Sequence, residues 1–371
     1  MVGIDYFRHI DGGLRGSGLY KATNFCFPAF AYLLYLCLYR LSVWPGTGAP
    51  NGLLVWTQTR QYQIVFAGYL VFSALLVASG ACLLLRKSNS RYRAAVILVI
   101  LLSPTFLGSG FLTGNSAVAV IGILLAALSL RNQKSVLARE AAMILIAMAA
   151  ALKIYPAVFG FLYVKEKRWK ETVRLIIYGI VFMFLPFWFF GGIPVIFDWL
   201  DNIFSTMGTM EYGRIQYISG AAYMLLSWLS GGTNTAVTVI GCRVLPVVFL
   251  VQMLLLGITS RSQYRTILFF TSAMIFFPSN SFRYTLGYMA IPLLFWYCCE
   301  TSEHKSADWL RAVLYGNIFT IPVWFGVLTG FALNLGYYTL TYVEVWIYSA
   351  AYLLLLLEIV SEFCSHLRRD V

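Results

Sequence analysis

Charged residues are scarce in this chain. Lysine, arginine, aspartate and glutamate together make up 11% of the 371 residues, whereas 60% are hydrophobic. A soluble globular domain carries about 25% charged residues, and a chain this apolar could not cover its surface with polar groups in water. The scarcity of charge therefore excludes an ordinary soluble domain and predicts that lipid is the solvent.

The chain also lacks the short motifs that hold nucleotides or metals. No P-loop pattern occurs, and the three histidines, at positions 9, 304 and 366, are far apart in the sequence. The seven cysteines mostly lie inside apolar segments without metal-like spacing, and the neighbours Cys298 and Cys299 match no standard metal or redox motif. We therefore expect no metal and no cofactor.

Long hydrophilic blocks and linkers are missing as well. In lipid every backbone polar group must be paired internally, so spanning segments must be helices or a closed barrel. The apolar runs are much longer than barrel strands of about ten residues. The sequence predicts an all-α polytopic integral membrane protein, a single transmembrane domain over 1–371 with about 10–12 membrane helices. The runs lie near 24–44, 63–85, 94–107, 115–130, 173–190, 235–257, 266–278, 284–299, 309–328 and 340–363.

The net charge of +12 comes from short basic clusters between the apolar runs. Such clusters are typical of cytoplasmic loops that meet anionic lipid, so we expect the lipid bilayer as a partner and no nucleic acid. The basic loops are 86–93, 131–139, 165–174, 258–265, 300–311 and the C-terminal tail. The loops near 108–114, 191–234 and 329–339 hold almost no lysine or arginine, so we expect them on the extracytoplasmic side.

One segment, 141–163, has basic flanks on both sides and Lys153-Ile154-Tyr155-Pro156 in its middle. Proline disfavours helix at the residue before it and removes a backbone donor. A single crossing would leave one basic flank outside, so we favour a re-entrant pair of short helices with Lys153 near the apex. Lys153 then either faces a polar cavity or an anionic partner, or extends to the interface beside Tyr155, and both alternatives are open.

The segment 191–234 is the longest that we expect on the extracytoplasmic side. It mixes charged residues with tryptophan and tyrosine, a composition that amphipathic helices lying in the membrane interface would explain. Long ordered loops often carry function, so its polar residues Asp198, Asp201 and Arg214 are candidate functional residues.

Several motifs follow one another in the order typical of one enzyme family. They are Asp5-Tyr6 with Gly16-Ser17-Gly18-Leu19-Tyr20, then Phe25-Cys26-Phe27-Pro28-Ala29-Phe30, Gly114-Asn115-Ser116, the alanine-rich stretch ending in Lys153-Ile154-Tyr155-Pro156-Ala157, and Arg168-Trp169-Lys170. Over roughly its first half the chain resembles the family 87 glycosyltransferases. The resemblance implies a GT-C fold and a hexosyltransferase, often a mannosyltransferase. Such an enzyme takes sugar from a polyprenyl-phosphate donor and adds it to an extracytoplasmic glycan or lipid of the cell envelope.

The resemblance also implies roles for individual residues. A carboxylate accepts the proton of the acceptor hydroxyl, and a cation offsets the charge of the leaving lipid phosphate. Asp5 matches the family's catalytic carboxylate, Asp11 is the next candidate, and Asp198 and Asp201 follow. Asp198, Asp201 and Arg214 are also possible contacts for the acceptor. Lys153, Arg283 and the adjacent Tyr284 are candidates for binding the donor phosphate. We expect a multi-pass protein of the cell membrane, a bacterial plasma membrane on this resemblance.

The N-terminus departs from the family pattern, in which a transmembrane helix precedes the catalytic aspartate. Only four residues precede Asp5, and Arg8, Arg15 and Lys21 favour a cytoplasmic N-terminus if the runs 24–44 and 63–85 both span the membrane. Three explanations are open: residues 1–23 are the remainder of a first extracytoplasmic loop that follows a missing helix, the early topology is irregular, or Asp5 is not catalytic. A transporter or flippase and a non-catalytic membrane scaffold are the alternative functions.

Overall fold

The protein is an all-α polytopic membrane protein, as its composition predicts. Four helical segments are long and apolar enough to cross a membrane: Arg60–Leu85, Trp169–Phe190, Ala236–Thr259 and Val345–Ser365. Among the described residues the exception to helix is a small antiparallel hairpin of β1 (Ala332–Leu335) and β2 (Tyr338–Thr341). The computed structural model describes residues 4–21, 26–42, 60–86, 93–107, 111–208, 216–231, 235–278, 283–299, 305–320, 332–335 and 338–367.

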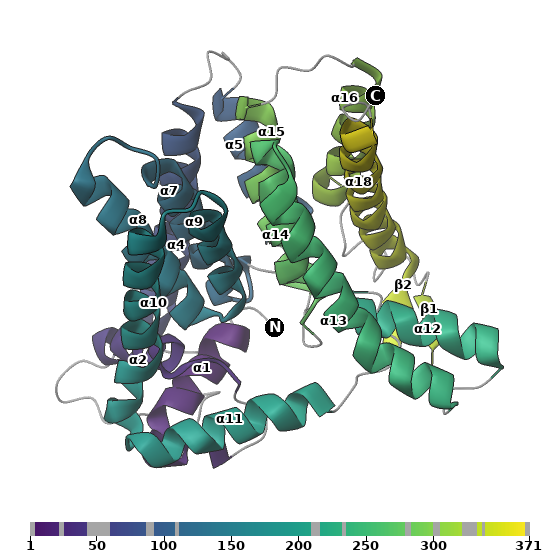
Figure 1. The fold of residues 1–371 in the computed structure, drawn as a ribbon. Coiled ribbons are helices and arrows are strands. Elements are labelled where there is room, and N and C mark those ends of the chain that lie inside the picture. The colour runs from purple at the N-terminus through teal and green to yellow at the C-terminus, as the bar shows by residue number, and fades with distance from the viewer. Residues whose placement is uncertain are drawn as a thin grey trace. The chain divides into compact units, whose positions relative to one another are not determined.

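The chain divides into two compact units, each built from two separate stretches of sequence, Met1–Leu84 with Gly110–Thr209 and Leu85–Ser109 with Met210–Val371. The prediction of a single domain over 1–371 stays a prediction. The first unit contains α1 (Ile4–Leu14), η1 (Gly16–Lys21), α2 (Ala29–Ser42), α4 (Arg60–Leu85), α7 (Ser116–Leu130), α8 (Val136–Leu152), η3 (Tyr155–Gly160), α9 (Phe161–Lys165), α10 (Trp169–Phe184), η4 (Leu185–Phe190) and α11 (Ile193–Gly208). The second contains α5 (Arg93–Leu101), α6 (Pro104–Phe106), α12 (Ile218–Ser230), α13 (Ala236–Thr259), α14 (Gln263–Phe276), η5 (Arg283–Met289), α15 (Ala290–Cys299), α16 (Lys305–Thr320), the hairpin and α18 (Tyr342–Leu367) (Figure 1).

Small residues let α4 and α7 approach closely in the first unit. A Cβ added to Gly122 of α7 would lie 2.5 Å from the backbone carbon of Leu76 and 2.6 Å from the backbone nitrogen of Val77. A Cβ on Gly80 of α4 would lie 2.7 Å from the carbonyl oxygen of Gly122. Close backbone approach at small residues is how membrane helices gain packing contacts, since lipid provides little hydrophobic driving force between them.

The segment predicted to be re-entrant leaves one end of the first unit and returns to it. α8 ends at Leu152, and Lys153 is extended, with φ −150° and ψ 125°, before the turn at η3. After α9 the chain meets the start of α8 again: Arg131 donates to Glu166 at 2.7 Å, and Arg168 donates to the Arg131 carbonyl at 3.2 Å. The two basic flanks therefore lie together, as predicted, and Lys153 lies at the far end.

Helix α1 lies at that far end. The backbone N–H of Asp5 donates to the carbonyl of Thr113 at 3.1 Å, and Asn202 of α11 donates to the carbonyl of Tyr20 at 2.7 Å. Both partners belong to loops that the charge pattern predicts to be extracytoplasmic. The prediction of a cytoplasmic N-terminus and the prediction of extracytoplasmic loops at 108–114 and 191–234 therefore exclude each other, because tertiary contacts hold α1 with these loops; we keep the second, which follows the charge pattern of the whole chain.

Helix α11 is amphipathic and runs across the direction of α8 and α10 (Figure 1). Its Val195, Trp199 and Asn202 are buried against the rest of the unit, whereas Phe197 and Phe204 are exposed. The exposed apolar residues of α11 can contact lipid, which agrees with the prediction that this segment lies in the membrane interface.

In the second unit, charged side chains join the ends of three helices. Glu358 of α18 accepts hydrogen bonds from Arg265 of α14 at 3.0 Å and from Arg311 of α16 at 2.5 Å, while Glu362 accepts from Arg265 at 2.9 Å. Arg311 also donates to Asp308 at 3.1 Å. Arg265 and Arg311, at the ends of the predicted cytoplasmic segments 258–265 and 300–311, thus meet on α18.

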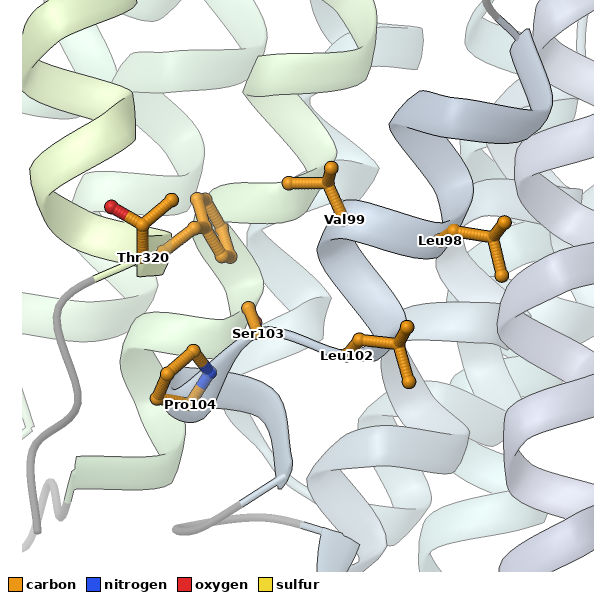
Figure 2. Close-up of a pocket in the computed structure, with 7 residues that line it drawn as sticks. Leu98, Val99, Leu102, Ser103, Pro104 and Thr320 are labelled. Atoms are coloured by element: carbon orange, nitrogen blue, oxygen red, sulfur yellow. The ribbon is translucent and has the colours of Figure 1, made fainter.

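An open surface pocket of about 320 Å³ also lies in the second unit, between the end of α5, α6 and the end of α16 (Figure 2). None of its lining residues is titratable, so these side chains could contact an apolar group but could not act as an acid or a base. It is lined by Leu98, Val99, Leu102, Ser103, Pro104, Phe319 and Thr320.

Candidate active site

The Asp5 carboxylate is held by the start of α7. Asn115 donates from its amide nitrogen to Oδ2 of Asp5 at 2.9 Å, and its amide oxygen accepts the backbone N–H of Ala117 at 2.9 Å. Asn115 is therefore the N-cap of α7 and the partner of Asp5 at once, a dual role that also fixes which way its amide points. Asp5 itself is only partly buried.

Glycine at position 114 allows α1 to approach this loop. Gly114 has φ +68°, a left-handed conformation that favours glycine, and an added Cβ would lie 2.8 Å from the Cβ of Tyr6. Its carbonyl accepts a hydrogen bond from Tyr35 at 3.0 Å. In the Gly-Asn-Ser motif, Gly114 thus forms the turn, Asn115 binds Asp5 of α1, and Ser116 is the first residue of α7.

Lys153 belongs to the same cluster. It is 1% exposed, its ammonium lies 4.7 Å from the centre of the Phe27 ring, and it is close enough to Asp5 to interact with the carboxylate electrostatically. Of the two sequence alternatives, the structure supports the one in which Lys153 faces the protein interior near an anionic partner. The break before Pro156 is what places it here, because Lys153 ends α8 in an extended conformation.

His9 is a site residue that sequence reasoning missed. It lies one helical turn after Asp5 on α1, and its ring stacks on Tyr35 with centroids 4.5 Å apart. Burial lowers the pKa of His9 to about 4, and the nearby charge of Lys153 acts in the same direction. Its spacing of four from Asp5 was the one signal in the sequence, and it predicts a shared helix face but not the nearby charge of Lys153.

Aromatic side chains enclose the cluster. Tyr6, Tyr35, Tyr62 and Tyr69 form one buried group with edge-to-face and tilted contacts, in which the Tyr35 and Tyr69 hydroxyls lie 3.0 Å apart. Such an environment has a lower effective dielectric than water, so the charges of Asp5 and Lys153 interact more strongly.

The other predicted site residues lie elsewhere. Asp11 is on α1 but pairs with exposed Arg15 at 2.9 Å. Asp198 and Asp201 are on α11, where Asp201 is exposed and Asp198 partly buried. Tyr284 is partly buried in η5 of the second unit, at whose start Arg283 lies, and the Arg283 side chain and Arg214 fall outside the described residues.

The cluster offers a carboxylate from Asp5, an ammonium from Lys153 and an imidazole from His9. Among the described residues, no group of three or more His, Cys, Asp or Glu side chains could hold a metal ion.

Comparison with known proteins identifies a family. No curated protein and no solved structure matches the chain. The family model described as glycosyltransferase family 87 matches residues 25–286, which include Asn115, Lys153 and Arg283, while Asp5 and His9 precede the matched range. Because that match spans well over half of the chain, the protein belongs to glycosyltransferase family 87.

Proposed function

We propose that the protein is a GT-C-type hexosyltransferase of a bacterial plasma membrane. It moves a sugar, mannose being the first to test, from a polyprenyl-phosphate donor to a hydroxyl of an extracytoplasmic glycan or lipid of the cell envelope. Family membership supports glycosyl transfer. The donor, the acceptor and the roles of the residues are the proposal.

The single observation that carries the proposal is the meeting of Asp5 with Lys153. Far apart in the sequence, they lie within electrostatic reach at the end of the unit opposite the basic loops. Positive-inside topology makes that end extracytoplasmic. A carboxylate and an ammonium within electrostatic reach of each other are the two groups that this scheme of inverting transfer from a lipid phosphate uses.

The reaction is a displacement at the anomeric carbon. The acceptor hydroxyl oxygen forms the new bond to that carbon while Asp5 takes the hydroxyl proton. The bond from the anomeric carbon to the phosphate oxygen breaks, and the polyprenyl phosphate leaves with the electron pair. Asn115 holds Oδ2 of Asp5, so Oδ1 is the oxygen that takes the proton in this scheme.

Lys153 balances the charge on the leaving phosphate. An ammonium buried in an apolar surrounding attracts an anion more strongly than one in water does. Arg283 stays the second candidate for this role, and Tyr284 follows it in sequence. Asp198, Asp201 and Arg214 are proposed to contact the acceptor.

The test measures transfer of radiolabelled mannose from polyprenyl-phosphate-mannose in proteoliposomes. Asp5→Asn keeps the shape but removes the base, so turnover should fall by roughly 10²–10⁴-fold. Asp11→Asn, on the same helix, is the matched control and should leave turnover unchanged. Lys153→Met should weaken donor binding by about 1.5–3 kcal/mol, whereas Lys170→Met at the opposite end should not.

Two outcomes would contradict the proposal. Full activity of Asp5→Asn would move the base to Asp11, Asp198 or Asp201. If the wild-type protein transfers no sugar from polyprenyl phosphates carrying mannose, glucose, galactose or arabinose, the donor class is wrong, and the transporter and scaffold alternatives return.

A further inference from the structure

The imidazole of His9 is held in a fixed orientation. Its ring lies between Tyr35, at a centroid distance of 4.5 Å, and Phe27, at 4.6 Å. Its Nδ1 lies 2.5 Å from the carbonyl oxygen of Asp5. A ring contacted on both sides and bonded at one nitrogen cannot turn without losing several contacts, so the direction of the other nitrogen is set as well.

The bond at Nδ1 determines the chemistry at Nε2. A carbonyl oxygen only accepts hydrogen bonds, so Nδ1 must carry the proton. Burial keeps the imidazole neutral at physiological pH, because it lowers the pKa of His9 to about 4. In the neutral ring Nε2 then has a lone pair and no proton. It can therefore only accept.

No group among the described residues makes a hydrogen bond to Nε2, although His9 is only 3% exposed. Buried polar atoms are normally paired, and one that is not calls for an explanation, such as a role in catalysis or binding or an ordered water. His9 also lies close enough to Asp5 and Lys153 for both charges to influence its pKa, so its free nitrogen belongs to the candidate site.

The partner of Nε2 can be identified by its chemistry. An ionised phosphate has only acceptor oxygens towards Nε2, so the donor phosphate does not fit it. A sugar hydroxyl can donate. We propose that His9 is a substrate-binding residue whose Nε2 accepts a hydrogen bond from a sugar hydroxyl placed beside Asp5. This inference rests on the proposed function and extends it from the phosphate to the orientation of the sugar.

Three variants separate the two nitrogens of His9. Asparagine places its amide near Nδ1 and can keep the bond to the Asp5 carbonyl, whereas glutamine reaches the position of Nε2 and can keep the acceptor. Phenylalanine keeps the ring between Phe27 and Tyr35 and removes both nitrogens. We expect kcat/KM for mannose transfer to fall about 10-fold in His9→Asn and His9→Phe and to stay near the wild-type value in His9→Gln.

The unfolding temperature of each purified variant separates this role from a structural one. If His9 mattered only through its bond to the Asp5 carbonyl, His9→Asn would be at least as active and as stable as His9→Gln. The inference would be overturned if His9→Asn were at least as active and as stable as His9→Gln, or if all three variants kept the kcat/KM of the wild type. His9→Phe keeps the test valid if the smaller amide variants do not fold.

Monodeoxy substrates locate the hydroxyl. One series removes single hydroxyls from the donor mannose, and the other removes them from an octyl mannoside acceptor. The substrate that lacks the relevant hydroxyl should react with the same kcat/KM in wild type and in His9→Asn. If that substrate is a deoxy donor, the hydroxyl that binds Nε2 belongs to the donor sugar; if it is a deoxy acceptor, the hydroxyl belongs to the acceptor. If His9→Asn lowered kcat/KM equally for every deoxy substrate of both series, the partner of Nε2 would be an ordered water, and the inference would be overturned. Absence of any wild-type transfer would instead refute the proposed function, and this inference with it.

Discussion

Asn115 offers the sharpest test of the site, because one side chain does two separable things. Its amide oxygen caps α7, and its amide nitrogen holds the Asp5 carboxylate, both at 2.9 Å. It is 2% exposed, so neither bond is replaced by water at no cost. Replacements that keep one function and remove the other should therefore have distinct effects.

The magnitudes follow from the two bonds. Asn115→Ser keeps a capping oxygen but loses the donor to Asp5, which should destabilise the protein by about 1.5–3 kcal/mol for a hydrogen bond to a charged group. Asn115→Ala also loses the cap, which adds about 0.5–2 kcal/mol. The unfolding temperature should therefore fall in the order wild type, Ser, Ala.

Asn115→Asp is the most informative variant. It keeps the shape and the cap, but it places a second carboxylate within hydrogen-bonding distance of Asp5. Two carboxylates that close do not both ionise readily, so the pair should share a proton. Stability should be near that of wild type in acid, where the proton is present, and should fall as the pH rises and the proton is lost.

Two assays measure this effect. The unfolding temperatures of wild type and Asn115→Asp are compared from pH 5 to pH 8, and their difference should grow with pH. The acidic limb of the profile of kcat/KM against pH should move to higher pH in the variant, because the shared proton must leave before Asp5 can act as a base. A constant temperature difference together with an unmoved limb would show that Asn115 does not contact Asp5.

Two further predictions concern the packing of each unit. Gly122→Ala should destabilise the first unit by about 1–3 kcal/mol, since the new Cβ meets the α4 backbone, while Gly68→Ala has open space and should not lower the unfolding temperature. Glu358→Gln should cost about 3–5 kcal/mol because it leaves buried Arg311 and partly buried Arg265 short of a counter-charge, whereas Asp11→Asn, in an exposed pair, should cost under about 1 kcal/mol. Equal unfolding temperatures within either pair would contradict the packing described.

The sequence alone determined the helices and the main break between them. In lipid an apolar run must satisfy its own backbone, so the long apolar run that begins near 235 could only be helical, and the structure has α13 at Ala236–Thr259. The effect of Pro156 is equally local, since it acts on its own N–H and on the preceding residue, and α8 ends at Leu152. The positive-inside pattern likewise indicated that the flanks of this segment lie together.

Only the tertiary structure decided which distant residues meet. Charge counting near the N-terminus favoured the cytoplasmic side, but backbone hydrogen bonds to Thr113 hold α1 with the opposite loops. The sequence did not indicate a role for His9. That role depends on ring contacts with Tyr35 and Phe27 and on the nearby charge of Lys153, which follows a different helix. Local signals extend over a turn or two of chain, whereas the site arises from packing between segments more than a hundred residues apart.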